Sequence, residues 1–323
     1  MNSAYKSIGL CAIAVTVLAL ATPIPCHSQE ETSLDKIFEV WKKRQKRVRS
    51  LHFSWVQTCT YGKGSLPSKD ALGIPGVNPE KPKLTPEVDT TIESKEQLWI
   101  KESLMRYTVD GPKWDMRMEK FLPRRYTSVY DGKHCRMFFG DQPNHERAVR
   151  PSGHLSRSES NQDVVDYHIW PILLTYRATD PTMGRFAAGQ WQLRDDKGMV
   201  NGRACALLAK TKGHRTETCW VDVARDYSIV RYEIATSDNP TFLRLQIDSR
   251  DEGARGWVPF RWRIDRLLAA TKTLDETASA EVIQFELNEP MDSSLFEFEF
   301  PPGTQVTDYT KCSVSSQLAH RLR

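Results

Sequence analysis

The strongest constraint on the fold is an alternation of apolar and polar residues that recurs along most of this sequence. Phe53, Trp55, Cys59 and Tyr61 alternate with polar residues, which is the period of two expected of a strand with one buried face. Similar patterns follow one another, and few long helical patterns come between them. We therefore predict a mainly β fold of the α+β class, with an antiparallel sheet built as a meander.

The predicted strands fall into two groups along the chain. In the first half the alternation runs through 53–61, 105–109, 114–118 and 135–139, and Asp131-Gly132 predicts a tight turn before the last of these. In the second half, strand-like runs occupy 190–195, 203–210, 215–222, 227–235, 241–248, 257–267 and 280–287. Phe296, Phe298 and Phe300 continue the alternation until Pro301-Pro302 ends pairing.

Two segments have helical patterns instead. Residues 34–48 place Leu34, Ile37, Phe38, Trp41 and Val48 on one stripe, and Thr32 with Asp35 suits a capping box. Residues 164–176 are apolar on nearly all sides, so this second helix must be covered, and Pro171 either kinks it or begins its second half.

The amino-terminal residues have the layout of a signal peptide. Lys6 precedes an apolar run from Ile8 to Leu20, which is shorter than the roughly 20 residues that span a bilayer. Cleavage could follow Ala21 or Ser28, and we assign 1–28 to the signal peptide. Residues before Cys26 do not form a lipobox, so a lipid anchor is not expected. We expect a periplasmic or secreted protein, peripheral to a membrane at most.

The mature chain is predicted to hold one β domain, residues 29–309. Within it, 62–90 carries five prolines and reads as a loop insertion between strands, because proline cannot donate to a ladder. Residues 310–323 have no apolar period, which predicts a flexible tail.

Known signatures of catalysis and metal binding are missing from the sequence. It has no H-E-x-x-H, G-x-S-x-G, Walker or dinucleotide motif, and its histidines lack ligand spacing. We therefore expect no enzyme, no catalytic residue, no cofactor and no metal, and assign Asp222 and Asp226 to a turn. The net charge of +4 is spread along the chain, which does not favour a nucleic-acid partner.

One pair of cysteines is placed for a disulfide bond. Cys205 and Cys219 flank a turn centred near Lys212 and Gly213, so they could lie opposite each other. The alternative is two buried thiols.

Taken together, these features resemble the LolA/LolB lipoprotein-carrier family, and more closely the divergent LolA-like envelope proteins of planctomycete-type bacteria. The strings that carry the resemblance span the domain: 40–45 (VWKKRQ), 48–50 (VRS), 53–55 (FSW), 219–222 (CWVD), 226–227 (DY), 231–233 (RYE) and 300–308 (FPPGTQVTD). The resemblance implies an unclosed antiparallel β-barrel whose concave face is covered by helices.

It also implies an apolar cavity on that face. The candidate ligand-binding residues are the large side chains Phe53, Trp55, Met105, Tyr107, Trp114, Met116, Met118, Trp170 and Leu173. The expected function is a non-catalytic periplasmic binder or carrier of lipid or of acylated lipoprotein. The alternative is a regulatory or scaffolding module like RseB, which binds a protein partner in the envelope. A hydrolase lacks motif support.

Overall fold

The computed structural model describes residues 32–66, 85–115, 118–140, 151–157, 166–181, 183, 184, 186, 191–237, 241–267 and 274–310. Residues 1–28, most of the proline-rich insertion and residues 311–323 lie outside these ranges, so the predicted signal peptide, loop and tail remain predictions. In the described part of the chain, no helix is long and apolar enough to cross a membrane.

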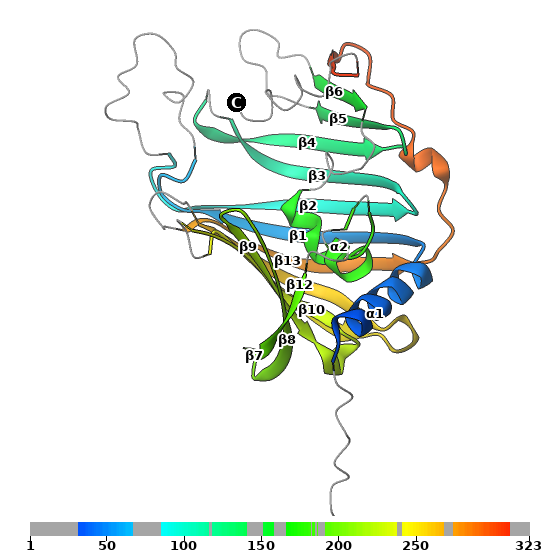
Figure 1. The fold of residues 1–323 in the computed structure, drawn as a ribbon. Helices are drawn as coiled ribbons and strands as arrows, with labels where there is room; N and C mark the ends of the chain where they lie inside the picture. The colour runs from blue at the N-terminus through cyan, green and yellow to red at the C-terminus, as the bar shows by residue number, and fades with distance from the viewer. Residues whose placement is uncertain are drawn as a thin grey trace, which may run out of the picture. The chain divides into compact units, whose positions relative to one another are not determined.

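Two α-helices and fourteen strands make up the described residues, with short 3-10 helices between some of them (Figure 1). The α-helices are α1 (Leu34–Arg47) and α2 (Trp170–Tyr176), and 3-10 helix η3 (Tyr167–Ile169) leads directly into α2. The strands are β1 (Ser50–Tyr61), β2 (Thr90–Lys101), β3 (Leu104–Asp115), β4 (Lys120–Tyr130), β5 (His134–Gly140), β6 (Ser152–Arg157), β7 (Gln192–Val200), β8 (Arg203–Lys212), β9 (Arg215–Asp222), β10 (Ser228–Thr236), β11 (Leu243–Asp251), β12 (Trp257–Leu267), β13 (Leu274–Leu287) and β14 (Gln305–Asp308).

All of these strands belong to one sheet, in the order β14-β6-β5-β4-β3-β2-β1-β13-β12-β11-β10-β9-β8-β7. Neighbours pair antiparallel, except that β14 runs parallel to β6. Among the described residues β7 and β14 are the two edges, so the sheet is open. This confirms the predicted mainly β fold and its unclosed antiparallel barrel.

The central strand β1 owes its place to alternation. Phe53 and Trp55 are buried on one face, while His52, Ser54 and Val56 on the other face are only half-buried. On one side β1 pairs with β2, its neighbour in sequence, and on the other with β13, more than two hundred residues later. The pairing of β1 with β13 therefore joins the strands from the first half of the chain to those from the second half.

Helix α1 begins one residue later than the predicted capping box. The side chain of Ser33, not Thr32, caps it by accepting a hydrogen bond from the Lys36 amide at 3.2 Å. The helix buries Ile37, Phe38 and Trp41 as predicted, and the Trp41 indole N–H donates to the Tyr227 carbonyl at 2.8 Å. The hydrogen bond to Tyr227 holds α1 against the segment that leads into β10.

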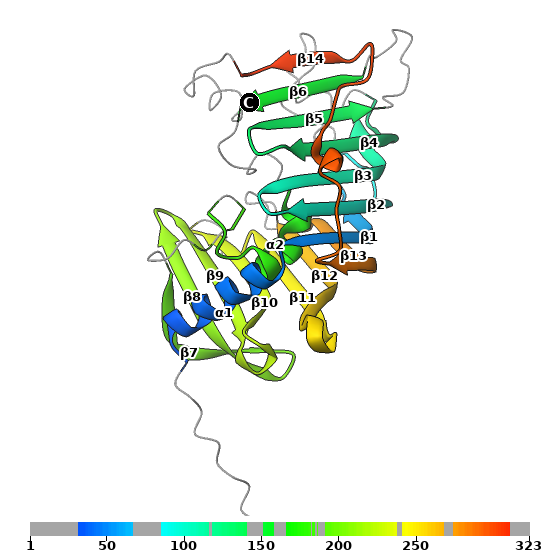
Figure 2. The same ribbon diagram turned by 90° about the vertical axis from the view of Figure 1, so that its right-hand side faces the viewer.

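Helices α1 and α2 lie on the same, concave side of the sheet (Figures 1 and 2). Their buried side chains join those of strands from both halves of the sheet in one hydrophobic cluster. The helical cover that the sequence analysis predicted is therefore confirmed.

One strand boundary was predicted wrongly. The alternating runs at 105–109 and 114–118 were predicted as separate strands, whereas β3 continues through Gly111 and Pro112 to Asp115. Pro112 lies opposite Pro123 of β4, and the pairing of the two strands continues past these residues although neither has an amide hydrogen to donate.

The alternation of Phe296, Phe298 and Phe300 does not form a strand. Phe296 ends a 3-10 helix, and the residues from Glu297 to Thr304 lead without a strand into β14.

Candidate binding site

The covering segment, residues 166–176, lies on the concave face and is built by local signals. The Asp166 side chain accepts a hydrogen bond from the His168 amide at 3.2 Å, which starts η3. Pro171 then occupies the first turn of α2, where its missing amide hydrogen costs nothing. Pro171 therefore begins the second half of the predicted helix. All seven side chains of α2 are buried.

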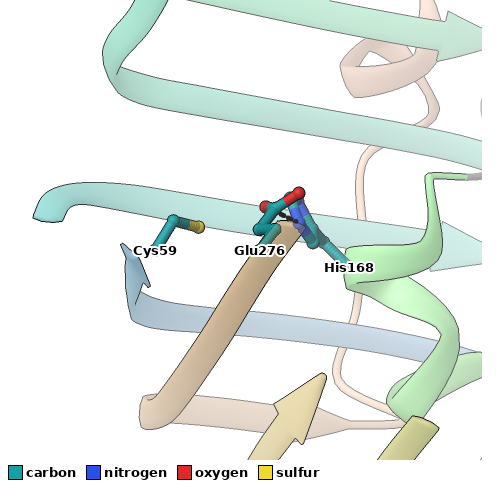
Figure 3. A group of neighbouring side chains, drawn as sticks. All are labelled: Cys59, His168 and Glu276. Carbon is teal, nitrogen blue, oxygen red and sulfur yellow. Dashed lines mark hydrogen bonds and ion pairs between the residues drawn. The ribbon is translucent and has the colours of Figure 1, made fainter. Parts of the chain in front are cut away.

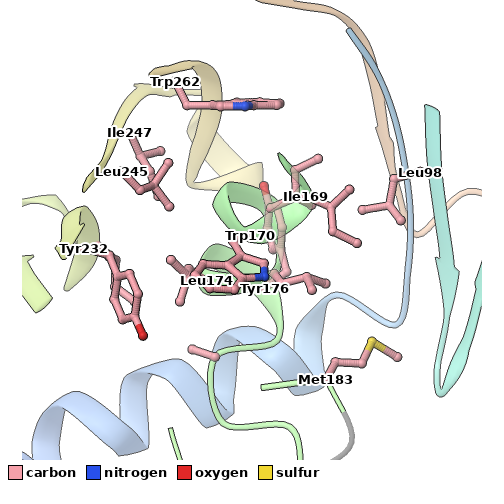
Figure 4. Packing of buried hydrophobic residues seen from close by; sticks show 14 of the residues in the cluster. Leu98, Ile169, Trp170, Leu174, Tyr176, Met183, Tyr232, Leu245, Ile247 and Trp262 are labelled. Carbon is pink, nitrogen blue, oxygen red and sulfur yellow. The ribbon is translucent and has the colours of Figure 1, made fainter. Parts of the chain in front are cut away.

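Six of the predicted binding residues come together beneath and within this segment. They share one hydrophobic cluster in which each is at most 8% exposed: Phe53, Trp55, Met105, Tyr107, Trp170 and Leu173. Figure 4 shows Trp170, Leu174 and Tyr176 of α2 surrounded by side chains from the sheet, including Tyr232, Leu245 and Trp262. The cluster is thus shared between α2 and the inner face of the sheet.

Aromatic contacts line this inner face. The Trp55 ring stacks on Tyr107 with centroids 6.2 Å apart and meets Trp262 edge-on at 5.4 Å. The Phe53 ring lies 5.9 Å from that of Tyr176 in α2. The arrangement is broad and apolar, as the sequence predicted, and in this structure α2 fills it.

The other three predicted residues lie apart. Trp114 is half-buried near the end of β3 and packs edge-on against Phe121 at 5.3 Å. Met118 lies in the turn before β4 and is 40% exposed. Met116 is outside the described residues.

A groove of about 690 Å³ occurs on the opposite, convex face. Val56 and Arg261 line it, and these residues alternate along their strands with the inward-facing Trp55 and Trp262. Charged side chains such as Glu281 also line the groove, so it lacks the apolar character of the concave face.

Two buried arginines hold the carboxyl end of α2 to α1. Arg177 donates from Nη1 to the Val48 carbonyl at 2.8 Å and from Nη2 to the Arg49 carbonyl at 3.1 Å. Arg44 of α1 donates to the Thr175 carbonyl at 3.4 Å and pairs with Asp226 at 3.1 Å. Burial lowers the pKa of Arg177 to about 10. Asp226 otherwise has the turn role predicted for it, with a left-handed backbone at φ 50°.

At the amino end of α2 the apolar face gives way to a cluster of ionisable groups. Cys59 of β1, His168 of η3 and Glu276 of β13 place their sulfur, nitrogen and oxygen atoms within 4.8 Å of one another (Figure 3). His168 Nε2 lies 3.3 Å from Glu276 Oε1, and Tyr167 Oη donates to Glu276 Oε2 at 2.6 Å. Arg266 Nη2 lies 3.2 Å from the same Oε2.

The charges in this cluster stabilise one another. Burial alone would raise the pKa of Glu276, but the hydrogen bond and charge of His168, the Tyr167 hydroxyl and Arg266 hold it at about 2. Burial alone would lower the pKa of His168, but the Asp166 carboxylate and the bond to Glu276 raise it to about 9. The pair is therefore an ion pair at neutral pH.

Burial opposes the ionisation of two other groups of the cluster. Burial raises the pKa of the Cys59 thiol, and Glu276 and Glu96 add to the effect. Glu96 is fully buried, and burial raises its pKa as well, although the Tyr107 and Ser94 hydroxyls donate to it. Gln57 completes this side, donating from Nε2 to Cys59 Sγ at 3.4 Å.

Sequence reasoning missed this cluster because its members are more than one hundred residues apart in sequence. His168 was assigned to the scattered histidines without ligand spacing. A usable signal was present on β1, where Gln57 and Cys59 continue the buried face of Phe53 and Trp55. A polar residue at a position where the pattern requires an apolar one indicates a buried partner.

Of the two alternatives for Cys205 and Cys219, the structure has the second: both are buried free thiols, and no disulfide bond joins them. Lys212 pairs with Arg215, so Cys219 lies opposite Leu208 rather than Cys205. Cys205 is three residues from Leu208 along β8, and an odd offset turns the side chain to the other face. Accordingly, Cys219 belongs to the concave cluster, and Cys205 packs with Val200 and Val230.

Comparisons with known proteins find similarity only at the level of solved structures. No protein-family model matches the chain, and no curated protein sequence does. A candidate outer membrane lipoprotein-sorting protein domain from Vibrio parahaemolyticus has 8% identity and a TM-score of 0.44, covering 81% of this chain and 96% of that one. A DUF1329 family protein from Desulfovibrio piger has 10% identity and a TM-score of 0.46, with coverage of 81% and 96%.

A LolA superfamily protein from Nitrosomonas europaea has 11% identity and a TM-score of 0.42, covering 81% of this chain and 97% of that chain. The family that the sequence resembles is therefore represented among the similar solved structures.

Proposed function

We propose that this protein binds a lipid, or the acyl part of a lipidated protein, on the concave face of its sheet. The observation that carries the proposal is the complete burial of α2 against the aromatic and methionine side chains of that face. In this proposal the covering segment occupies the binding surface in the unliganded protein and is displaced when cargo enters.

The energetics favour such an exchange. A helix of seven residues is too short to be stable by itself, so α2 depends on the sheet and on Arg177 and Arg44 for its position. An acyl chain gains about 0.8 kcal/mol for each buried methylene, which can offset the loss of α2 contacts. Met105 is flexible enough to repack around chains of different length.

Buried hydrogen-bond donors support a cargo that carries carbonyl groups. Among the described residues, the indole N–H groups of Trp55 and Trp262 and the Tyr176 hydroxyl are buried with no hydrogen-bond partner. Since buried polar groups are nearly always satisfied, an ester or amide oxygen of an acylated cargo would find donors here.

We infer binding rather than catalysis from the state of the ionisable groups. Glu276 and His168 neutralise each other, and burial raises the pKa of the Cys59 thiol. None of these groups is poised as a nucleophile or a general base. We place this function in the periplasm, after removal of residues 1–28.

Uptake of a fluorescent fatty acid by the purified protein tests the proposal. The variant Leu173→Ala removes contacts between α2 and the sheet and opens space, so it is expected to bind the probe several-fold more tightly than wild type. Ile283→Ala is the matched control, because Ile283 is 65% exposed and lies at the groove on the convex face.

Failure of both the wild type and Leu173→Ala to take up the probe would exclude the proposal. Native mass spectrometry of protein purified from its own envelope provides an independent measurement, with bound acyl species expected. If a partner protein instead co-purifies in stoichiometric amount and no acyl species is bound, the result would favour the alternative function, a regulatory module that binds a protein partner.

A further inference from the structure

We propose that Cys59, His168 and Glu276 form a binding site for a divalent cation of the zinc class. Their donor atoms are a sulfur, an imidazole nitrogen and a carboxylate oxygen, all within 4.8 Å of one another. Zinc is the cation that most often takes this mixture of ligands in proteins. The three residues come from β1, η3 and β13, so the fold rather than a sequence motif assembles the site (Figure 3).

The distance between two of the three donor atoms suits such an ion. His168 Nε2 and Glu276 Oε1 are 3.3 Å apart. A tetrahedral zinc site with bonds of about 2.0–2.1 Å has ligand-to-ligand edges of about 3.3 Å. The pair therefore needs little movement to share a cation, and the Cys59 sulfur points toward Glu276 (Figure 3).

An unsatisfied polar atom provides independent support. Gln57 is 1% exposed, and its Oε1 has no hydrogen-bond partner within the described residues. The same amide donates from Nε2 to Cys59 Sγ at 3.4 Å. Half a turn of the amide would place Oε1 beside the Cys59 sulfur, as a candidate fourth ligand.

The surroundings also resemble those that orient metal ligands. Asp166 Oδ1 lies 3.8 Å from His168 Nδ1, the ring nitrogen that faces away from Glu276. Tyr167 and Arg266 both hold Glu276 through Oε2, which leaves Oε1 directed at His168. A carboxylate behind a histidine and hydrogen bonds to the distal carboxylate oxygen are typical outer partners of zinc ligands.

The charges of the site balance when the ion binds. Binding would release one proton from the Cys59 thiol and one from the His168 imidazolium as the dication enters. Two positive charges replace two protons, so the net charge of the buried cluster is unchanged. No ligand is oxidised or reduced, and the positive charge of Arg266 stays paired with Asp275, whose Oδ2 lies 2.7 Å from Arg266 Nε.

Such an ion would tie the covering segment to the sheet. His168 lies two residues before α2, whereas Cys59 and Glu276 belong to adjacent strands. The cation would therefore slow the departure of α2 from the concave face. This consequence rests on the proposed function, but binding of the ion does not.

Cobalt(II) titration of the full chain tests the site without reference to cargo. The chain is stripped with a chelator, kept reduced and carries no affinity tag. One equivalent of cobalt should produce a thiolate-to-metal charge-transfer band, and zinc should abolish it. Cys59→Ser should remove the band, and His168→Gln should weaken cobalt binding by at least about tenfold. Cys135→Ser, a buried thiol elsewhere in the core, is the control and should retain the band.

Absence of a thiolate band in the wild type would overturn the assignment, and so would a band that survives in Cys59→Ser. Circular dichroism establishes that each variant is folded, and if Cys59→Ser is not, His168→Gln decides the question. A chain that binds cobalt but takes up no fatty acid would retain the metal site and lose the proposed function. A chain that takes up fatty acid but binds no cobalt would retain the proposed function and lose the metal site.

Discussion

Arg177 Nη1 donates a hydrogen bond to the carbonyl oxygen of Val48 at 2.8 Å, joining the residue after α2 to the residue after α1. The same guanidinium donates to the carbonyls of Arg49 and Tyr176, and Arg177 is 2% exposed. A single side chain thus satisfies acceptors at the ends of both helices on the concave face.

Replacing Arg177 with methionine should lower the free energy of unfolding by about 2–3 kcal/mol, because buried carbonyls lose charged donors. Urea denaturation measures the change. Arg263→Met is the control and should stay within about 0.5 kcal/mol, since Arg263 is half exposed and its ion pair is with the partly exposed Asp265. Equal losses in the two variants would contradict the role assigned to Arg177.

The packing of α2 predicts a larger effect at Ile172, which is 0% exposed. Ile172→Ala should cost about 2–5 kcal/mol of unfolding free energy, through lost burial and the cavity left behind. Val88→Ala, at a position 69% exposed, should change it by less than about 0.5 kcal/mol. A loss below about 1 kcal/mol in Ile172→Ala would mean that α2 does not pack in solution as it does here.

Glu96 predicts a dependence of stability on pH. Burial raises its pKa above the ordinary value of 4.5, so the folded state holds the proton more tightly than the unfolded state. The stability that it contributes is therefore present below pH 4.5 and is lost as the pH rises through the folded pKa. In Glu96→Gln this loss disappears, and the variant should gain stability relative to wild type between pH 4 and pH 8.

Thermal unfolding across that pH range measures the difference. Glu93→Gln, at an exposed position of the same strand, is the control. A Glu96→Gln variant that follows the wild-type pH profile would contradict the prediction.

The free state of Cys205 and Cys219 predicts that reduction has no effect on the sheet. The midpoint of thermal unfolding should be the same with and without dithiothreitol. Peptide mapping without reduction should recover the two cysteines in separate peptides. A 205–219 crosslink in protein prepared with its thiols blocked would show that the register of β8 and β9 differs from the one described.

Local patterns were enough to predict most of the fold. Period-two runs located the strands of the second half, and the stripe from Leu34 to Val48 located α1. The predictions were less accurate where a shift of one residue changes which side chains face each other. The spacing of Cys205 and Cys219 does not reveal the register that the turn at Gly213 and His214 sets, and in that register the two cysteines are not opposite each other.

The site was predictable only in its apolar part. Phe53, Trp55, Met105 and Tyr107 carry a pattern that marks them as inward-facing, and the structure brings them together. Cys59 shares that pattern, but nothing in the sequence places it beside His168 and Glu276, because three distant elements must pack before these residues meet. Their proximity is a property of tertiary structure.

The pairing of β1 with β13 has a kinetic consequence. Leu51 lies opposite Leu287, so the middle of the sheet closes over a chain separation of more than two hundred residues. Contacts of this range form slowly, because the entropy of a long loop is lost before they contribute. Until residues near 287 arrive, Phe53 and Trp55 have only β2 beside them, and a nascent or unfolded chain would expose aromatic surface that invites aggregation or a chaperone.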